Sequence, residues 1–148
     1  MDEIDHRIVV LLQQRARRSF QDIGSHVGLT APAVKRRVDR LEEQGVIRGY
    51  AAIVDPASIG WPTHAIVSLM CEGRMSGADL SAVVSRHREV VSAFTVAGEA
   101  AAVLHVRARD TAHLERTLER LRDHPGIIRT QSQVVLSTLL EHPVFSSG

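Results

Sequence analysis

Several residue types and patterns are scarce or missing in this chain of 148 residues, and each absence narrows the class of protein. The single cysteine, Cys71, excludes an intrachain disulfide and fits a reducing compartment. No apolar run is long enough to cross a bilayer, and the acidic N-terminus does not resemble a secretion signal. We therefore expect a cytoplasmic protein without a membrane segment.

Signatures of catalysis and metal binding are also missing from the sequence. It contains no glycine-rich phosphate loop, no nucleophile elbow and no paired-cysteine metal site. The eight histidines are scattered, and no two of them stand four residues apart, as a helical metal site would require. We therefore expect no enzyme activity, no metal site and no required cofactor.

Positive charge is concentrated in one short stretch, although the net charge of the chain is only +1. Between Arg15 and Arg40 there are seven basic residues and two acidic ones, which gives a local charge of +5. Such a stripe on a nearly neutral protein indicates a defined anionic partner. A solvated helix face is the simpler alternative, so the location of the charges has to decide.

Three helices are predicted in the N-terminal part of the chain. The first spans residues 2–14 and has apolar residues at helical spacing. The second begins after Ser19, which opens an S-x-x-D capping pattern, and Gly28 suits the left-handed position that ends a helix. The third begins after Thr30, which we expect to serve first as its cap, and ends at Gly45.

The second and third helices fit the helix-turn-helix plan, in which the later helix enters the DNA major groove. An ordinary three-helix packing unit is the alternative. Because Val34, Val38 and Leu41 face the core at i, i+4 and i+7, most cations of the third helix point outward, and only Arg37 is expected to pair with an internal acid. Alanines near the start of the helix suit thymine methyls. The predicted DNA-binding residues are Arg17, Arg18, Thr30, Ala31, Ala33, Lys35, Arg36 and Arg40.

Strands and helices alternate in the second half of the chain. A β-like run over residues 46–55 leads into a linker predicted over residues 51–62, which contains two prolines and a glycine. The order that follows is βαββαβ, the ferredoxin-like plan of an antiparallel sheet with both helices on one face. Its other face must be covered or paired with another subunit. The predicted strands cover 63–71, 90–98, 101–108 and 127–140, and the helices 77–87 and 110–124.

The chain resembles the Lrp/AsnC family, the feast/famine transcription regulators. The resemblance covers nearly the whole length and rests on DEIDHRIVVLLQ, on the stretch from Phe20 to Gly60, on VAGE and on HPGIIRT. It implies an α+β protein, with a winged helix-turn-helix domain over residues 1–50 and a ferredoxin-like domain for effector binding and oligomerisation over residues 63–148. It also implies double-stranded DNA as a partner, homodimers formed through the sheets, and often octamers of four dimers.

Members of the family often bind amino acids or related metabolites at subunit interfaces, and here the turn that this implies is unusual. The family turn commonly reads Gly-x-x-Asp followed by an aromatic residue, whereas this chain has Ala101 at the aspartate position. An aspartate can hold a ligand ammonium and alanine cannot. Glu99 is either a replacement acid or an exposed turn residue. The effector-binding residues that the resemblance implies are Gly98, Glu99, Ala100, Ala101, Ala102, Thr130, Ser132 and Val134.

Two other functions are open on the same architecture. Sirohaem decarboxylases resemble this family, and His105 and Arg107 could mimic the histidine and arginine that those enzymes use. A metabolite sensor that no longer binds DNA is the other alternative. The intact third helix favours a sequence-specific DNA-binding transcriptional regulator whose assembly or DNA affinity responds to a small metabolite.

Overall fold

The computed structural model describes residues 1–73 and 75–141. The chain divides into two units, one containing residues Met1–Ile53 and the other residues Val54–Leu139, while Leu140 and Glu141 group with the first. The boundary between the units falls inside the expected linker, and residues 142–148 of the expected second domain lie outside the described residues. Among the helices of the described ranges, none is long and apolar enough to span a membrane.

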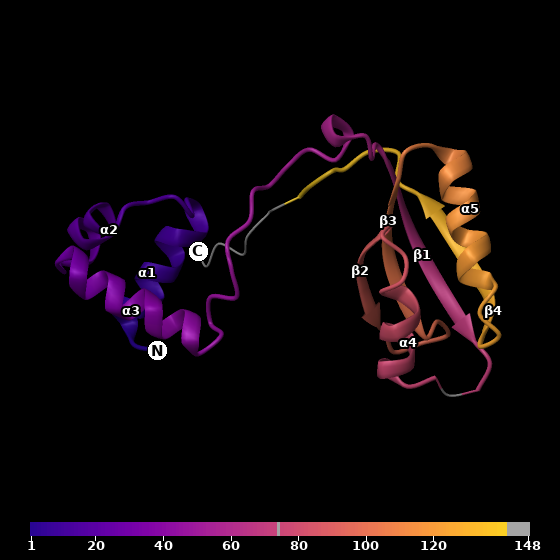
Figure 1. Ribbon diagram of the computed structural model, residues 1–148, viewed down its shortest axis with the longest axis horizontal. Coiled ribbons are helices and arrows are strands. Elements are labelled where there is room, and N and C mark those ends of the chain that lie inside the picture. The colour runs from indigo at the N-terminus through magenta and orange to yellow at the C-terminus, as the bar shows by residue number, and fades with distance from the viewer. Residues whose placement is uncertain (74, 142–148) are drawn as a thin grey trace. The chain divides into compact units, whose positions relative to one another are not determined.

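The first unit contains three helices, α1 (Glu3–Gln14), α2 (Phe20–Val27) and α3 (Ala31–Glu43) (Figure 1). A capping box starts α1, because Asp2 and Asp5 each accept a hydrogen bond from the other's backbone N–H. The Ser19 hydroxyl caps α2 as predicted. The predicted cap of α3 is wrong in one respect: Thr30 occupies the N-cap position, but its side chain makes no capping hydrogen bond.

The three helices enclose one apolar core. Val34, Val38 and Leu41 of α3 are buried, as their spacing predicted. Each large aliphatic side chain removed from water in this way contributes on the order of 1.5–3 kcal/mol to folding. Because α3 buries this side, its other side is left for solvent. The core residues supplied by α1 and α2 are Ile8, Leu12, Ile23 and Val27.

The turn between α2 and α3 depends on two glycines with different roles. Gly28 has the left-handed backbone that was expected, with φ of 72°. Gly24 is buried inside α2, and its carbonyl accepts a hydrogen bond of 3.0 Å from the N–H of Leu29. A Cβ atom added at Gly24 would lie 2.3 Å from the carbonyl oxygen of Leu29. The turn can therefore return this close to α2 only because residue 24 has no side chain.

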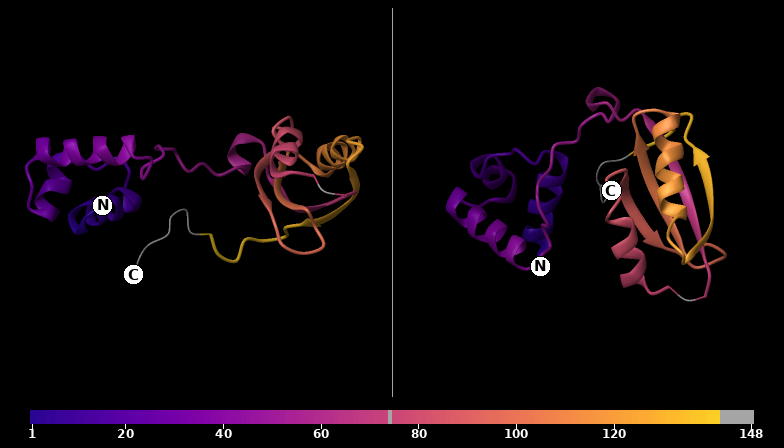
Figure 2. Two further views of the ribbon diagram at one scale, coloured as in Figure 1. Left: turned by 90° about the horizontal axis from the view of Figure 1, so that it is seen from below. Right: turned by 45° about the vertical axis from the view of Figure 1, so that its right-hand side comes forward.

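The second unit is a four-stranded antiparallel sheet covered by two helices. A short 3-10 helix (Ala57–Ile59) precedes it, and the strand order is β2-β3-β1-β4. Figure 2 shows that both helices lie on the same face of the sheet, so the ferredoxin-like prediction is confirmed. The elements are β1 (Thr63–Cys71), α4 (Gly77–Val84), β2 (Val90–Thr95), β3 (Ala102–Ala108), α5 (Thr111–Arg122) and β4 (Ile127–Val134).

Burial alternates along the two central strands of this sheet. On β1, Val67 and Leu69 are buried beneath the helices, whereas Ile66 between its buried neighbours faces the other side and is half-buried. On β3, Leu104 is buried and its neighbour His105 is half-buried. No helix in the described residues covers this second face. We refer to it as the open sheet face.

Two predicted strand segments do not form. Residues 46–55 contain no strand, and β4 ends at Val134 instead of continuing to residue 140. The last contacts between β1 and β4 are the pair of Ala65 with Val134 and a hydrogen bond from the N–H of Val135 to His64. Because β1 begins at Thr63, which this register would place opposite residue 136, it offers no partner to residues 137–140. Strand-like sequence needs a neighbouring strand to become a strand.

A buried carboxylate ties the start of β2 to α5. Glu89 is only 7% exposed, and its Oε1 receives hydrogen bonds from His113 (2.9 Å) and Arg120 (2.5 Å). The backbone N–H of Arg109 donates to the other ring nitrogen of His113, Nδ1, at 3.2 Å. Nε2 therefore carries the hydrogen that reaches Glu89. Trp61 contacts this group, with its ring centroid 5.6 Å from that of His113.

The second unit should lose stability in acid through Glu89. Burial by itself raises the pKa of this carboxyl, but hydrogen bonds from its own N–H, Arg120 and His113 outweigh burial and lower the pKa to about 2, from an ordinary 4.5. A depressed folded-state pKa stabilises the protein above the ordinary value, and the contribution is lost as pH falls from about 4.5 to about 2. We expect a loss on the order of 3 kcal/mol over that range.

Denaturant titrations at several pH values, followed by Trp61 fluorescence, would measure this loss. Glu89→Gln should remove most of the pH dependence below pH 4.5, whereas Glu115→Gln on the exposed side of α5 should leave it unchanged. If the free energy of unfolding falls by the same amount below pH 4.5 in wild type and in Glu89→Gln, other carboxylates are responsible for the loss.

Candidate nucleic-acid interface and effector turn

The outward side of α3 carries two exposed cations. Lys35 forms an ion pair of 2.5 Å with Asp39, one turn further along the helix. The Arg36 side chain is exposed and makes neither a hydrogen bond nor an ion pair within the part of the chain that the structure describes. A guanidinium has five donors in a planar fork, which matches phosphate oxygens or a guanine edge. Among the cations of α3, Arg36 is therefore the one whose side chain has no partner among the described residues of its own unit.

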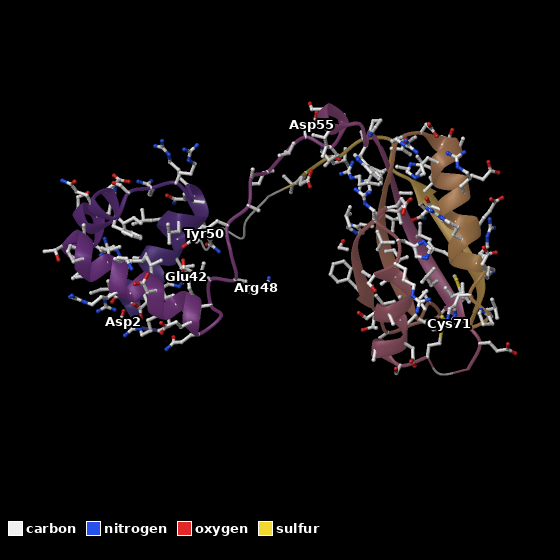
Figure 3. The ribbon with its side chains drawn as sticks, in the orientation of Figure 1. Asp2, Glu42, Arg48, Tyr50, Asp55 and Cys71 are labelled. Carbon is white, nitrogen blue, oxygen red and sulfur yellow. The ribbon has the colours of Figure 1, made fainter. Side chains whose placement is uncertain are left out.

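Arg37 faces the protein instead, as its position next to the buried side predicted. Its Nη1 lies 2.7 Å from Asp5 Oδ1 and 2.6 Å from Asp2 Oδ2; Figure 3 shows Asp2 near α3. Asp5 is 1% exposed. Burial acts to raise its pKa, but the N–H of Asp2 and the guanidinium of Arg37 hold the pKa below its ordinary value. Asp5 therefore stays ionised and joins α1 to α3.

Two of the expected phosphate contacts already have carboxylate partners. Arg40 Nη2 donates to both oxygens of Asp5, at 3.0 and 2.8 Å, although the side chain is about half exposed. Arg18 Nη1 lies 2.7 Å from Asp22, and the Arg18 side chain is only 20% exposed. The expectation that Arg40 projects freely from α3 is thus wrong. Its charge is largely matched by Asp5, so any contact with DNA would have to share or break that pair.

The remaining predicted DNA contacts lie near the start of α3 and before α2. Thr30 is exposed, and Ala31 and Ala33 are partly exposed in the first turn of α3. Small side chains at this position allow a close approach to base edges. Arg17 is exposed in the loop between α1 and α2. Among the described residues of the first unit, Thr30 and Arg17 are left exposed, and Ala31 and Ala33 are left partly exposed.

One side-chain hydrogen bond connects the segment after α3 to the end of the helix. The hydroxyl of Tyr50 donates a 2.8 Å hydrogen bond to Glu42 in the last turn of α3 (Figure 3). Burial and this negatively charged neighbour raise the pKa of Tyr50 to about 12, so the phenol keeps its hydrogen and remains a donor at neutral pH. This bond fixes the first residues after the helix without a wing strand.

The predicted effector turn connects β2 to β3. Gly98 has φ of 144°, outside the range that other residues readily adopt, and the N–H of Ala101 donates to the carbonyl of Leu69 at 2.8 Å. Glu99 is exposed and lies 2.9 Å from Arg129 of β4. Its charge is therefore already matched by an arginine, and the turn offers a ligand mainly backbone groups and small side chains.

The predicted β4 positions lie at different distances from that turn. Leu69 pairs with Ala102 on one side and with Thr130 on the other, so Thr130 is two strands away from the end of the turn. Ser132 and Val134 pair with residues nearer the start of β1 and lie progressively further along the sheet. Within one chain the structure brings only the first of the three close to the turn.

His105 and Arg107 lie side by side on the open sheet face. The His105 ring contacts those of His64 and Phe94, with centroids 5.6 and 6.0 Å apart. Arg107 sits opposite His64 in the β1–β3 ladder. Within the described ranges no group of three or more histidine, cysteine or acidic residues is arranged to hold a metal ion.

Comparison with known proteins identifies both halves of the chain. Residues 1–42 match the AsnC-type helix-turn-helix domain, and residues 64–145 match the Lrp/AsnC ligand binding domain. The chain belongs to the Lrp/AsnC family of transcriptional regulators. It is 48% identical to the HTH-type transcriptional regulator Rv2324 of Mycobacterium tuberculosis over 141 residues, which is 95% of each chain. The regulator LrpA of the same organism is 34% identical over 93% of this chain and 91% of its own.

Solved structures of Lrp/AsnC regulators share the whole fold. The leucine response regulatory protein LrpA of M. tuberculosis superposes with a TM-score of 0.85 at 33% identity, covering 95% of this chain and 96% of its own. The feast or famine regulatory protein of M. tuberculosis, solved in complex with L-methionine, gives a TM-score of 0.90 at 33% identity over 97% of both chains. These relatives are regulators and not enzymes, so the decarboxylase alternative for His105 and Arg107 is set aside.

The geometry of the helix-turn-helix unit depends on two residues, Asp5 and Gly24, that were not predicted from the sequence. Asp5 belongs to the acidic N-terminus, and its pairing with two arginines of α3 has no local signal in the sequence. Gly24 stands four residues before the glycine that ends α2. A glycine inside a short amphipathic helix is a detectable signal for close backbone approach, but its partner could not be identified from spacing alone.

Proposed function

We propose that this regulator binds double-stranded DNA through the start and the outward side of α3. The observation that carries the proposal is Arg36, exposed and uncommitted on the helix that follows the glycine turn. In the proposed complex Arg36 and Lys35 reach base edges or phosphates, and Ala31 and Ala33 contact thymine methyls. Thr30 and Arg17 bind the backbone. Arg18 and Arg40 contribute only by sharing their carboxylate partners.

The protein is proposed to act as a homo-oligomer. The open sheet face presents half-buried apolar, histidine and hydroxyl side chains that no helix among the described residues covers, and a second copy of the same face is a suitable cover. Two copies would place two α3 helices on a roughly two-fold operator. Assembly of four such dimers into an octamer is the larger form that the family resemblance implies.

A small metabolite, an amino acid or a related compound, is proposed to modulate the regulator by favouring one assembly or DNA-bound state over another. Two related regulators have been solved with L-methionine. The turn from Gly98 to Ala102 and the β4 residues Thr130, Ser132 and Val134 of a neighbouring subunit are the proposed binding region. The proposal includes no permanently bound cofactor.

Replacing Arg36 with alanine tests the DNA proposal. We expect operator affinity to fall by about 10- to 100-fold, because one bidentate base contact contributes roughly 1–3 kcal/mol. The operator is first selected from genomic fragments bound by the wild-type protein, and gel shifts at several salt concentrations then compare the variants. If Arg36 holds phosphate instead, the salt slope should become shallower by about one and sequence preference should persist.

Arg116→Ala is the matched control, because Arg116 is an exposed arginine of α5 on the second unit. It should leave both affinity and salt slope unchanged. Equal operator affinity and equal sequence preference for wild type and Arg36→Ala would remove Arg36 from the interface. Failure of the wild-type protein to retain any DNA fragment would favour the alternative of a metabolite sensor that does not bind DNA.

A further inference from the structure

A pocket of about 350 Å³ opens on the second unit, beside α4 and away from the sheet ladder. One wall is a single face of the chain around α4, formed by residues at i, i+3, i+4 and i+7. These residues are Asp79, Ala82, Val83 and Arg86. Pockets of this size suit small metabolites.

Charge and polarity are ordered along this wall. Asp79 lies in the first turn of α4 and Arg86 just beyond its last turn, where the N–H of Arg86 still donates to the carbonyl of Val83 at 3.3 Å. Seven residues of helix separate two Cα atoms by roughly 10 Å. The small apolar side chains of Ala82 and Val83 lie between them. The wall is therefore an apolar strip with a carboxylate at one end and a guanidinium at the other.

The opposite wall is formed by Met75, His124 and Gly126. The N–H of Gly126 donates to His124 Nδ1 at 3.2 Å, which leaves Nε2 as the ring nitrogen that carries hydrogen. A Cβ atom at Gly126 would lie 2.8 Å from the Met75 sulfur. The glycine thus keeps room beside the thioether, a polarisable group that adapts to apolar ligands of different shape.

Both charged groups retain binding capacity. The side-chain hydrogen bonds that Asp79 accepts, from the N–H and the hydroxyl of Ser76, go to Oδ2, at 3.1 and 2.6 Å. Those bonds, with the nearby His124, hold the pKa of Asp79 below its ordinary value, so the carboxylate is ionised at neutral pH. Oδ1 accepts no hydrogen bond, and Arg86 has no carboxylate partner, among the residues that the structure describes.

We propose that this pocket binds the zwitterionic head group of a free L-α-amino acid with an apolar side chain. The ammonium donates to Asp79 Oδ1, the carboxylate accepts from Arg86, and the side chain packs against Met75 and Val83. The ammonium and the carboxylate of an amino acid carry opposite charges, as do the two ends of this strip, so each can form a charge-assisted hydrogen bond. A simple anion would be repelled by Asp79 and a simple cation by Arg86.

The proposal rests on the proposed function, since it supplies the acid that a metabolite-responsive regulator of this family would otherwise lack. At the turn, Ala101 offers no carboxylate and Glu99 is paired with Arg129. The pocket beside α4 is a separate site, lined by none of the turn residues. An amino acid bound there would contact both α4 and the turn before β4.

Calorimetry with the full chain and L-methionine as the probe tests the proposal. Two analogues serve as references: 4-(methylthio)butanoate lacks the ammonium, and methioninamide lacks the carboxylate. Each should bind the wild-type protein about 10- to 100-fold more weakly than L-methionine, the change expected when one charge-assisted hydrogen bond is lost. Asp79→Asn should weaken L-methionine to a similar extent but leave the affinity for 4-(methylthio)butanoate unchanged. Arg86→Gln should behave in the same way toward methioninamide.

Two variants control for structural effects. Ser76→Ala removes the same helix cap but keeps the Asp79 charge, and Arg122→Gln removes an exposed arginine of α5; both should bind L-methionine like the wild type. Equal L-methionine affinity in wild type and Asp79→Asn would overturn the proposal, as would binding that is lost only in Ala101→Trp. If none of the twenty amino acids shifts the melting temperature or gives heat while DNA binding persists, this site fails and the regulator function stands.

Discussion

Replacing Asp5 with alanine should lower the free energy of unfolding of the first unit by about 3 kcal/mol. Asp5 is 1% exposed and accepts hydrogen bonds from Arg37, Arg40 and the N–H of Asp2. Removing one partner of a buried ion pair costs about 3–5 kcal/mol, and we expect the lower end because both arginines remain partly in contact with solvent. The loss should also loosen α1 from α3.

The effect of Asp5→Ala would be measured by denaturant unfolding monitored by circular dichroism, with Trp61 fluorescence reporting separately on the second unit. Asp39→Ala is the matched control, because Asp39 and Lys35 form an exposed ion pair on the surface of α3. Such surface pairs contribute less than about 1 kcal/mol to stability. If the two variants unfold at the same denaturant concentration, the buried carboxylate does not hold the helices together.

The same ion pair predicts how acid affects the helix-turn-helix unit. The pKa of Asp5 in the folded protein lies below its ordinary value of 3.8, so its contribution is present above that value and is lost as pH falls below it. In Asp5→Ala that part of the acid sensitivity should disappear. Because Arg40 is bound to Asp5, protonation or removal of the carboxylate also releases a cation of α3 for an external anion.

Periodic apolar patterns predicted most of this fold because they report on burial directly. Val34, Val38 and Leu41 recur at helical spacing and are buried, which also determined which side of α3 faces solvent. The alternation in THAIVSLMC likewise predicted β1 residue for residue. A pattern of this kind depends only on which side of an element is covered, and a single sequence contains that information.

Features that depend on a distant partner could not be predicted in the same way. Arg40 looked free because its partner Asp5 is 35 residues away. Residues 135–140 looked like strand, but β1 provides no ladder beyond Ala65 and His64. The sequence left open whether Glu99 replaces the missing aspartate. In the structure its carboxylate lies 2.9 Å from the guanidinium of Arg129, on a strand 30 residues later in the chain. In each case the residue or strand that determines the outcome is distant in the sequence and is brought close only by the fold.

Replacing Gly24 with alanine should destabilise the first unit by about 2 kcal/mol, the upper end of the overpacking cost less the gain in helix propensity, and reduce operator binding. Helix propensity alone favours alanine by roughly 1 kcal/mol. The new Cβ atom, however, would lie 2.3 Å from the carbonyl oxygen of Leu29, and overpacking of this kind typically costs 1–3 kcal/mol and sometimes more. Because Leu29 also donates its N–H to Gly24, the turn cannot relieve the collision without moving α3, whose position determines how its cations meet DNA.

Gly45→Ala separates this close approach from a simple backbone preference. Gly45 has φ of 70°, but a Cβ atom there would meet nothing within 4 Å, so its cost should be only the roughly 1–2 kcal/mol of a left-handed residue. Its effect on operator affinity should also be small, since the turn between α2 and α3 is untouched. If Gly24→Ala instead raised the melting temperature, helix propensity would outweigh the contact with Leu29, and the turn would have more freedom than its geometry indicates.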